Sequence, residues 1–281
     1  MDFVEQFEDH FRRRLISQNE QVQKMCDYLV EAGGKRVRPS IFFALAEDLV
    51  ESKSGDINEL LVPCFDVASG IEMIHQSSLV HDDLPSLDND DYRRGKPTFH
   101  RAFSEGYAVL FGDWLLNRAF LVVSSTSLPT EVKFEIMSLL FSANERLLEG
   151  QFLDLSEDSN PMNVARQKTA ALFAAVFACP GVLVGVTREV KSLLYELGET
   201  FGMLFQIEDD LRDWEKDKTK LAPNSSFASL PQEVIEKTVL ELLEAFRACF
   251  KRVKQVCRSE LSRTADVLRS LSFEGFSLMF D

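Results

Sequence analysis

Little positive charge is present in this sequence, and that limits the partners it can bind. Lysine and arginine total 31 residues and aspartate and glutamate total 45, so the formal net charge is 31 − 45 = −14 over 281 residues. Such an excess of negative charge disfavours nucleic acid and anionic membrane as main partners. An acidic protein that handles anions must therefore concentrate cations locally or recruit a metal.

Paired cysteines, an export signal and a long unbroken apolar run are also missing. The five cysteines include no C-x-x-C pair, which is typical of reduced thiols in a cytoplasmic protein. The first residues, Met1 to Glu5, are acidic and mixed, unlike a secretory leader. The most apolar stretch, residues 170–186, contains Pro180-Gly181 and predicts a buried helix broken near its centre. We expect a cytoplasmic protein without a transmembrane segment.

Strict two-residue alternation of apolar and polar residues is almost absent, which argues against β-sheet. Apolar residues recur instead at spacings of three and four, as at Leu194, Leu197 and Phe201. Turn residues interrupt this pattern only at long intervals, and the segments between them would form roughly nine or ten helices. No internal repeat or low-complexity linker divides the chain. We therefore predict one all-α domain over residues 1–281, with functional carboxylates pointing inward from neighbouring helices.

The first of two aspartate clusters contains Asp82, Asp83 and Asp88. Pro85 disfavours helical angles at Leu84, so we expect a helix to end there with the first two aspartates in its last turn. A helix C-terminus carries partial negative charge and is a poor place for carboxylates unless a cation compensates. Mg²⁺, which prefers carboxylate, water and phosphate oxygens, fits that need. A solvated acidic loop is the alternative interpretation.

The second cluster contains Asp209, Asp210 and Asp213 within a strongly helical segment. Asp209 and Asp213 are four residues apart and share one helix face, where their charges repel each other. A metal ion between them would turn that repulsion into attraction.

A basic segment, Gly33 to Pro39, separates the first two expected helices and carries Lys35, Arg36 and Arg38. Pro39 suits the first turn of a helix, whose free amides beside these cations would form an anion site, plausibly for diphosphate. A plain basic turn is the alternative.

His75 precedes Asp82 by seven residues, so on one helix the two would share a face about 10 Å apart. A small diphosphate ester would span that distance. The His81-Asp82 pair also suggests a helical metal phosphohydrolase, but the sequence has only four histidines and that function leaves the second aspartate cluster without a role. Nucleophilic catalysis is not indicated, because no serine or cysteine stands in a recognisable elbow.

Taken together, these motifs resemble the trans-isoprenyl diphosphate synthases, the family of farnesyl and geranylgeranyl diphosphate synthases. The resemblance runs from Gly33 to Asp213, with its elements in the family's order. They are Gly-Gly-Lys-Arg-Val-Arg-Pro at 33–39, Glu72-Met73-Ile74-His75, the first aspartate cluster with Arg93-Arg94-Gly95, Gly112-Asp113-x-Leu115, Gly150-Gln151, Lys168-Thr169, and Phe205-Gln206 before the second cluster. Each element alone is weakly specific, whereas the whole series in register is highly specific.

The resemblance implies a large all-helical bundle around a central cavity lined by the two aspartate motifs, and a homodimer. It implies that isopentenyl diphosphate is joined to dimethylallyl, geranyl or farnesyl diphosphate, giving a longer all-trans prenyl diphosphate. Up to three Mg²⁺ would be held by the six aspartates: Asp82, Asp83, Asp88, Asp209, Asp210 and Asp213. By the same resemblance the allylic substrate would meet Arg93, Lys168 and Gln206, with Thr169 beside them, and isopentenyl diphosphate would meet Lys35, Arg38, His75 and Arg94. Lys168 would act with the aspartates in catalysis.

Product length in this family depends on the residues one helical turn before the first aspartates. Those positions hold Ser77 and Ser78 here, where many farnesyl synthases carry an aromatic residue. Two small side chains predict a deeper tunnel and a geranylgeranyl product, with Phe120 as a candidate for its floor. A farnesyl product is the alternative.

Departures from the family pattern follow Asp213. The segment 214–230 is shorter than in the family, and Asn224 stands where the family has a lysine. The missing positive charge would have to come from Lys216, Lys218 or Lys220. The end of the chain, residues 273–281, lacks a basic tail. Two further alternatives follow: a class I terpene cyclase, disfavoured by the second motif and the basic segment, and a non-catalytic subunit that modulates another prenyltransferase.

Overall fold

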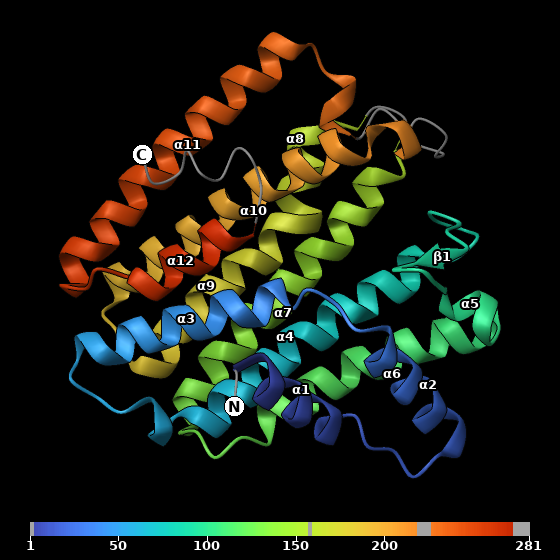
Figure 1. The fold of residues 1–281 in the computed structure, drawn as a ribbon, viewed down its shortest axis with the longest axis horizontal. Coiled ribbons are helices and arrows are strands. Elements are labelled where there is room, and N and C mark those ends of the chain that lie inside the picture. Colours follow the sequence, from blue (N-terminus) through green and yellow to red (C-terminus); the bar gives the residue numbers. More distant parts are fainter. Residues whose placement is uncertain (1–2, 157–158, 218–225, 272–281) are drawn as a thin grey trace. The chain divides into compact units, whose positions relative to one another are not determined.

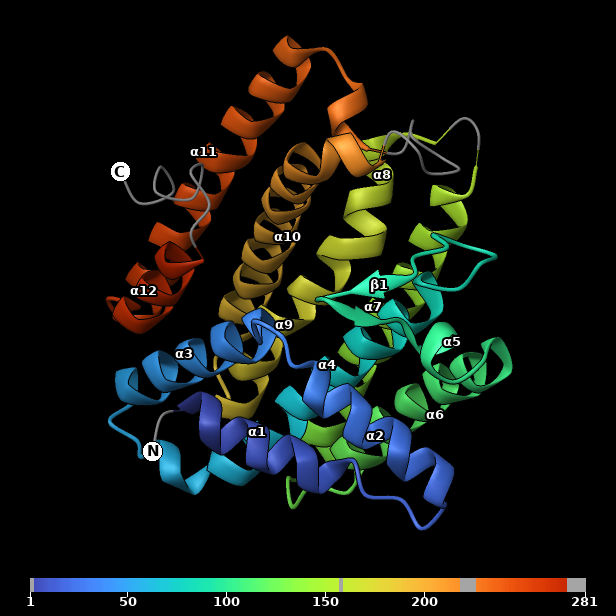
Figure 2. The ribbon, with the colours of Figure 1, turned by 45° about the vertical axis from the view of Figure 1, so that its right-hand side comes forward.

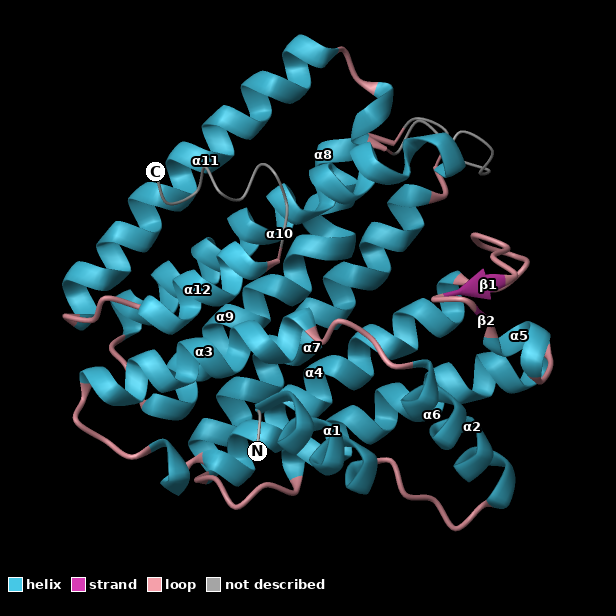
Figure 3. Ribbon diagram, in the orientation of Figure 1, coloured by secondary structure: helices cyan, strands magenta, loops and turns pink. Residues whose placement is uncertain are grey.

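The protein is almost entirely helical, as the sequence predicts (Figures 1 and 3). The computed structural model describes residues 3–156, 159–217 and 226–271, without the side chains of residue 4 and of residues 213–217. The α-helices and π-helix are α1 Phe3–Arg14, α2 Glu20–Ala32, α3 Val37–Ser52, α4 Leu61–Asp82, α5 Phe99–Ala102, α6 Glu105–Ser124, α7 Thr130–Asp154, α8 Pro161–Val164, η2 Ala165–Ala170, α9 Ala171–Val184, α10 Arg188–Asp217, α11 Gln232–Cys257 and α12 Ser262–Ser270. Two short 3₁₀ helices, η1 Ile57–Glu59 and η4 Phe227–Ser229, and two short strands, β1 Tyr92–Arg93 and β2 Lys96–Pro97, complete the described elements.

The chain divides into two compact units. The first comprises Met1–Ser40 and Leu61–Lys133, and the second comprises Ile41–Leu60 and Phe134–Asp281. One of the two aspartate clusters lies in each unit. The single domain expected over residues 1–281 stays a prediction.

In the first unit, α4 and α6 pack side by side (Figure 1). Glycines set how closely they approach: a Cβ on Gly70 would come within 2.5 Å of Val123, and one on Gly112 would collide with the His81 ring. Most of α4 is buried, in keeping with a sequence that is apolar on nearly every face. This close packing fixes the end of α4, where the first aspartate cluster begins.

A β-hairpin follows the first aspartate cluster, although the sequence gave no convincing strand. Tyr92 pairs with Pro97 and Arg93 with Lys96. The loop between the strands is Arg94-Gly95, with φ of 54° and 78°, as two-residue hairpin turns of the mirror-image type require. Strands of two residues are too short to leave any periodic pattern in a sequence, which is why the hairpin was missed.

In the second unit, α9 and α11 both pack against α10 (Figure 2). The break expected at Pro180-Gly181 is wrong, because α9 runs through both residues to Val184. Every residue from Ala171 to Leu183 is buried, so packing around the helix outweighs the hydrogen bond that proline forfeits. Gly198 and Gly202 on α10 allow the close approach, since a Cβ on either would meet η2 or α9 backbone at 2.5 Å.

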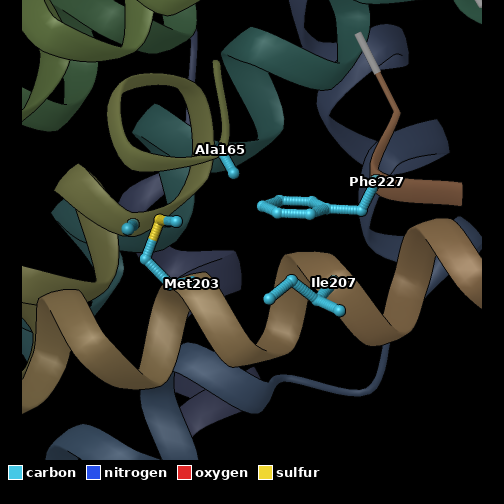
Figure 4. Close-up of a cluster of buried hydrophobic side chains, with 5 residues drawn as sticks. Ala165, Met203, Ile207 and Phe227 are labelled. Atoms are coloured by element: carbon cyan, nitrogen blue, oxygen red, sulfur yellow. The ribbon is translucent and has the colours of Figure 1, made fainter. Parts of the chain in front are cut away.

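A small apolar cluster ties η2, α10 and η4 together in the second unit (Figure 4). The Phe227 ring lies between Ala165 of η2 and Ile207 of α10, and Met203 packs beside them. All of these residues are buried. The cluster places η4 against the part of α10 that carries the second aspartate cluster.

Two helical segments, Glu105–Ser124 and Pro161–Val184, are long and apolar enough to cross a membrane by length and composition. The second is 78% buried in its most apolar window, as in the core helix of a soluble protein, and the first is 39% buried. Such helices are weak evidence of a span. The absence of a transmembrane segment stays a prediction.

Candidate active site

The cations of the basic turn between α2 and α3 differ in burial and in their partners. Arg36 is buried, with its backbone at φ 47°, and its guanidinium donates to Glu8 at 2.5 Å and to Glu72 at 2.7 Å. It also lies 5.0 Å from the Phe11 ring centroid. Arg36 therefore anchors the turn to α1 and α4 rather than facing an anion. Lys35, by contrast, is exposed.

Positive charges surround His75 in the first unit. Burial lowers the pKa of His75 well below its usual 6.5, and the charges of Arg38 and Arg94 lower it further. Arg93 and Arg36 act in the same direction. The imidazole is therefore neutral near pH 7, and the role of these residues in binding an anion stays a prediction.

Arg94 reaches this pocket from the hairpin turn. Its guanidinium donates to the Gly33 carbonyl, and a Cβ on Gly34 would lie 2.8 Å from its Nη1. Glycine at position 34 therefore leaves the space through which the arginine crosses the basic turn. Burial lowers the pKa of Arg94, with Arg36 and Arg93 adding to that effect and Glu72 and Asp83 opposing it.

The first aspartate cluster begins where α4 ends, as Pro85 led us to expect. Asp82 is the last residue of α4. The chain then turns back, because the Asp88 amide donates to the Asp82 carbonyl at 2.8 Å and the Asn89 amide donates to the Leu84 carbonyl at 3.0 Å. Asn89 has φ 53°, a left-handed backbone that asparagine tolerates. Asp82 and Asp88 are thereby neighbours despite the five residues between them.

Asp83 has a different environment from its neighbours. It is 3% exposed, and Arg93 of the hairpin donates to it through Nε at 2.7 Å and lies within 2.5 Å through a terminal nitrogen. Burial raises the pKa of Asp83, and Arg93 partly reverses that shift. In this structure the carboxylate of Asp83 orients Arg93, one of the cations expected to meet the allylic diphosphate.

The second aspartate cluster lies on α10. Asp210 is 8% exposed and accepts two hydrogen bonds, from the Gln206 amide at 2.5 Å and from the Phe227 backbone N–H at 2.7 Å. Asp209 is more exposed and pairs with Arg212 on the same helix. Asp213 belongs to α10, but its side chain lies outside the part of the chain that the structure describes. Lys218, Lys220, Asn224 and residues 273–281 also lie outside it, as does the side chain of Lys216.

Two of the residues expected to bind substrate are linked to Asp210 by hydrogen bonds. Thr169 donates to the Gln206 carbonyl oxygen at 2.5 Å, and Gln206 in turn donates to Asp210. Lys168, which precedes Thr169, pairs with Asp154 at 2.6 Å. The second unit thus links Thr169 through Gln206 to the second aspartate cluster. Asp154 was not anticipated, although it stands four residues after Gly150 on the same helix face.

Lys168 and Thr169 lie in η2, which is a π-helix, a form that is rare and frequent at functional sites. Gly150 of α7 stands opposite, and a Cβ there would collide with the Lys168 backbone. This contact accounts for the glycine of the Gly150-Gln151 motif in physical terms.

The carboxylates fit Mg²⁺ by their chemistry. Asp82, Asp88 and Asp209 offer only oxygen donors, as a hard cation prefers. His81, the nearest nitrogen ligand in sequence, instead has Nε2 3.1 Å from the Val109 carbonyl. That contact also disfavours a histidine-aspartate phosphohydrolase. Among the described residues no three acidic, histidine or cysteine side chains are grouped to hold a metal. Mg²⁺ commonly binds through one or two carboxylates, with water and substrate phosphate completing its shell.

The residues expected to set product length lie on α4 and α6. Ser77 is buried and donates to the Gly112 carbonyl at 2.8 Å, so its side chain faces α6. Ser78 is half-buried and donates to the His75 carbonyl of its own helix at 2.8 Å. Phe120 is half-buried on α6.

Comparison with known proteins places this arrangement among prenyl diphosphate synthases. The sequence model of the family described as polyprenyl synthetase matches residues 19–225. A farnesyl diphosphate synthase of Micrococcus luteus is 31% identical over 96% of this chain and 90% of its own length. Geranylgeranyl pyrophosphate synthase 3 of Arabidopsis thaliana, chloroplastic, is 40% identical over 71% of this chain, a match that spans 57% of that relative. The crystal structure of a Helicobacter pylori geranyltransferase complexed with magnesium and isoprenyl diphosphate is 27% identical, with a TM-score of 0.83 over 95% of this chain and 94% of that one.

Proposed function

This chain belongs to the polyprenyl synthetase family of prenyltransferases, and we propose that it condenses isopentenyl diphosphate with an allylic diphosphate to give geranylgeranyl diphosphate. The observation that carries the proposal is that the chain has two kinds of site. One is a pocket of arginines around a neutral His75, and the other is a set of carboxylates with their own hydrogen-bonded cations and amides.

The carboxylates best placed to hold Mg²⁺ are Asp82, Asp88 and Asp209. Asp213 follows Asp209 by four residues in the sequence. When bound, Mg²⁺ neutralises the charge that develops on the departing diphosphate. Arg93 in the first unit and Lys168 in the second each offer positive charge to a diphosphate, and Asp83 and Asp154 orient those two cations. Thr169 and Gln206 complete the allylic site. The isopentenyl double bond then attacks the allylic cation, and a proton is lost to the departing diphosphate.

The pocket formed by Arg38, Arg94 and His75, with Lys35 at its exposed edge, is the proposed site of isopentenyl diphosphate. This substrate keeps its diphosphate, so the pocket must bind an anion without activating it as a leaving group. Arginine and lysine charges and a neutral imidazole meet that requirement without a metal.

A geranylgeranyl product is proposed because Ser77 and Ser78 are small. Relatives of this chain carry both farnesyl and geranylgeranyl names, so the family alone does not decide the length. Ser77→Phe places an aromatic ring where α4 meets Gly112 and is expected to shorten the product. Mass spectrometry of the products of both enzymes measures this, and an unchanged product would count against the tunnel.

We also propose that the protein is a homodimer, because apolar side chains are exposed along two helices. Leu110 of α6 is 65% exposed and Phe134 of α7 is 74% exposed, and on α7 the exposed residues recur every seven positions at Phe134, Phe141 and Leu148. A soluble protein rarely leaves such stripes uncovered. Phe141→Glu is expected to halve the mass measured by light scattering, whereas Ile16→Glu, at an isolated exposed position, should leave it unchanged.

The experiment that tests the function is an assay of the purified chain with Mg²⁺, isopentenyl diphosphate and each of dimethylallyl, geranyl and farnesyl diphosphate. A product of twenty carbons by mass spectrometry, lost on chelation and in Asp82→Ala, supports the proposal. A fifteen-carbon product would support the farnesyl alternative. No condensation with any starter would favour the non-catalytic partner subunit.

A further inference from the structure

One face of α7 holds the π-helical segment η2 at three successive turns. Arg146, Gly150 and Asp154 stand four residues apart, so they share that face. Asp154 accepts the Lys168 ammonium, Gly150 makes room for the Lys168 backbone, and Arg146 holds the residues just before it. The contacts of Asp154 and Gly150 reach Lys168 itself, whereas those of Arg146 act on it through Arg166 and Gln167.

Arg146 uses its whole guanidinium for this purpose. It donates to the Gln167 side chain at 2.7 Å and to the Arg166 carbonyl at 3.2 Å, both in η2. It also donates to the Tyr195 hydroxyl at 2.6 Å and to Glu199 at 2.7 Å, both on α10. The residue is thus a bridge from α7 to η2 and α10 at once.

A π-helix is rare and is found mostly as a single turn within an α-helix, so we expect it to persist where the surroundings hold it. On the α10 side, Thr169 bonds to Gln206 and Ala170 packs against Gly202. On the α7 side, the bonds from Arg146 are those that reach the backbone and side chain immediately before Lys168.

We propose that Arg146 is a positioning residue for the allylic diphosphate: by fixing η2 it sets where Lys168 and Thr169 meet that substrate. The inference rests on the proposed function and extends it to a residue outside the family motifs identified in the sequence. The role depends on the planar fork of the guanidinium, because its three nitrogens reach separate acceptors on two elements, whereas a lysine offers a single nitrogen.

The test compares Arg146→Met with Lys191→Met. Lys191 of α10 pairs with Glu135 of α7 at 2.6 Å, so its loss breaks an ion pair between the same two helices without touching η2. Arg146→Met is expected to raise the KM for the allylic diphosphate on the order of tenfold, with the KM for isopentenyl diphosphate changed less than about twofold. Lys191→Met should change neither. Arg146→Lys should resemble Arg146→Met, and recovery by lysine would show that charge alone matters.

Hydrogen exchange measures the geometry independently of turnover. Amides of residues 165–170 should exchange faster in Arg146→Met than in Lys191→Met, and equal exchange would overturn the inference. If the wild-type chain condenses no substrate, the proposed function fails while the exchange comparison still decides whether Arg146 holds η2. Should Arg146→Met fail to fold, Gln167→Leu removes the acceptor in η2 and leaves the bond from Arg146 to Glu199 intact, and the same outcomes apply.

Discussion

The two aspartate regions hold a buried carboxylate in opposite ways. Asp83, at the end of α4, is neutralised by a cation, Arg93. Asp210, on α10, accepts from two neutral donors, the Gln206 amide and the Phe227 backbone N–H. An arginine thus holds Asp83, whereas amide and hydroxyl groups link Thr169 and Gln206 to Asp210.

The difference teaches that burial separates the aspartates of each region into two roles. In each region the more buried aspartate serves as an anchor, orienting Arg93 in one case and fixing η4 in the other. The aspartates beside them, Asp82 and Asp209, are less buried. Four predictions test this comparison, in order of decreasing effect.

The largest effect expected is a loss of catalytic rate, and it should be similar in the two aspartate regions. Asp82→Ala and Asp209→Ala should each lower kcat on the order of a thousandfold, because each removes a carboxylate proposed to hold Mg²⁺ against the leaving diphosphate. Steady-state kinetics over a Mg²⁺ titration measure the loss. Asp90→Ala, in the same acidic loop, is the control and should stay within a few-fold of wild type. A large loss in only one of the two variants would break the symmetry between the regions.

A large loss of stability is expected in the arginine-rich region. Arg36→Met leaves Glu72 buried without its cation and should lower the free energy of unfolding by about 3 kcal/mol. Lys35→Met, one residue away but exposed, should cost less than about 0.5 kcal/mol. Urea unfolding followed by circular dichroism compares them. Similar losses in the two variants would show that Arg36 is no anchor.

Removing the negative charge should destabilise the fold more at Asp83 than at Asp210. Asp83→Asn removes the nearer anionic partner of Arg93, leaving Asp90 at 3.6 Å, and should cost about 2 kcal/mol. Asp210→Asn keeps one acceptor oxygen and turns an amide toward the other donor, so about 1 kcal/mol is expected. Denaturation midpoints of both variants give the difference. A larger loss in Asp210→Asn would reverse our account of the two regions.

The smallest effect is a pH dependence confined to the first region. His75 has a lowered pKa in the folded protein, so below pH 6.5 the unfolded chain takes up a proton that the folded state resists. Stability from this residue is therefore present above pH 6.5 and is lost as the pH falls, by at most about 1.4 kcal/mol per pH unit. His75→Gln should show a smaller loss of thermal stability than wild type between pH 7 and pH 5.5. Identical pH profiles would contradict a neutral buried imidazole.

Local chemistry made much of this molecule predictable from sequence. Pro85 marked the end of α4, and spacing placed Asp209 and Asp213 on one helix. These features depend on residues a few positions apart, where backbone restrictions and helix periodicity decide the outcome.

Features that depend on distant residues were not predictable. The inward turn of Arg36 requires Glu8 and Glu72, which are 28 and 36 residues away. The role of Asp210 likewise depends on Phe227 beyond the end of its helix. Nothing near either residue in the sequence signals these partners, because burial and ion pairing are settled only when the chain packs.

The π-helical turn at η2 also bears on how this sequence can be recombined with its relatives. A π-helical turn holds more residues than an α-helical turn, so one deletion within 165–170 would let the segment close as regular α-helix. Each residue advances an α-helix by about 100°, and closing the wider turn would absorb that change, so the helix beyond the deletion would keep its face. Chimeras joined within this turn would therefore tolerate the loss of one residue, a loss that would rotate the far side of a regular α-helix.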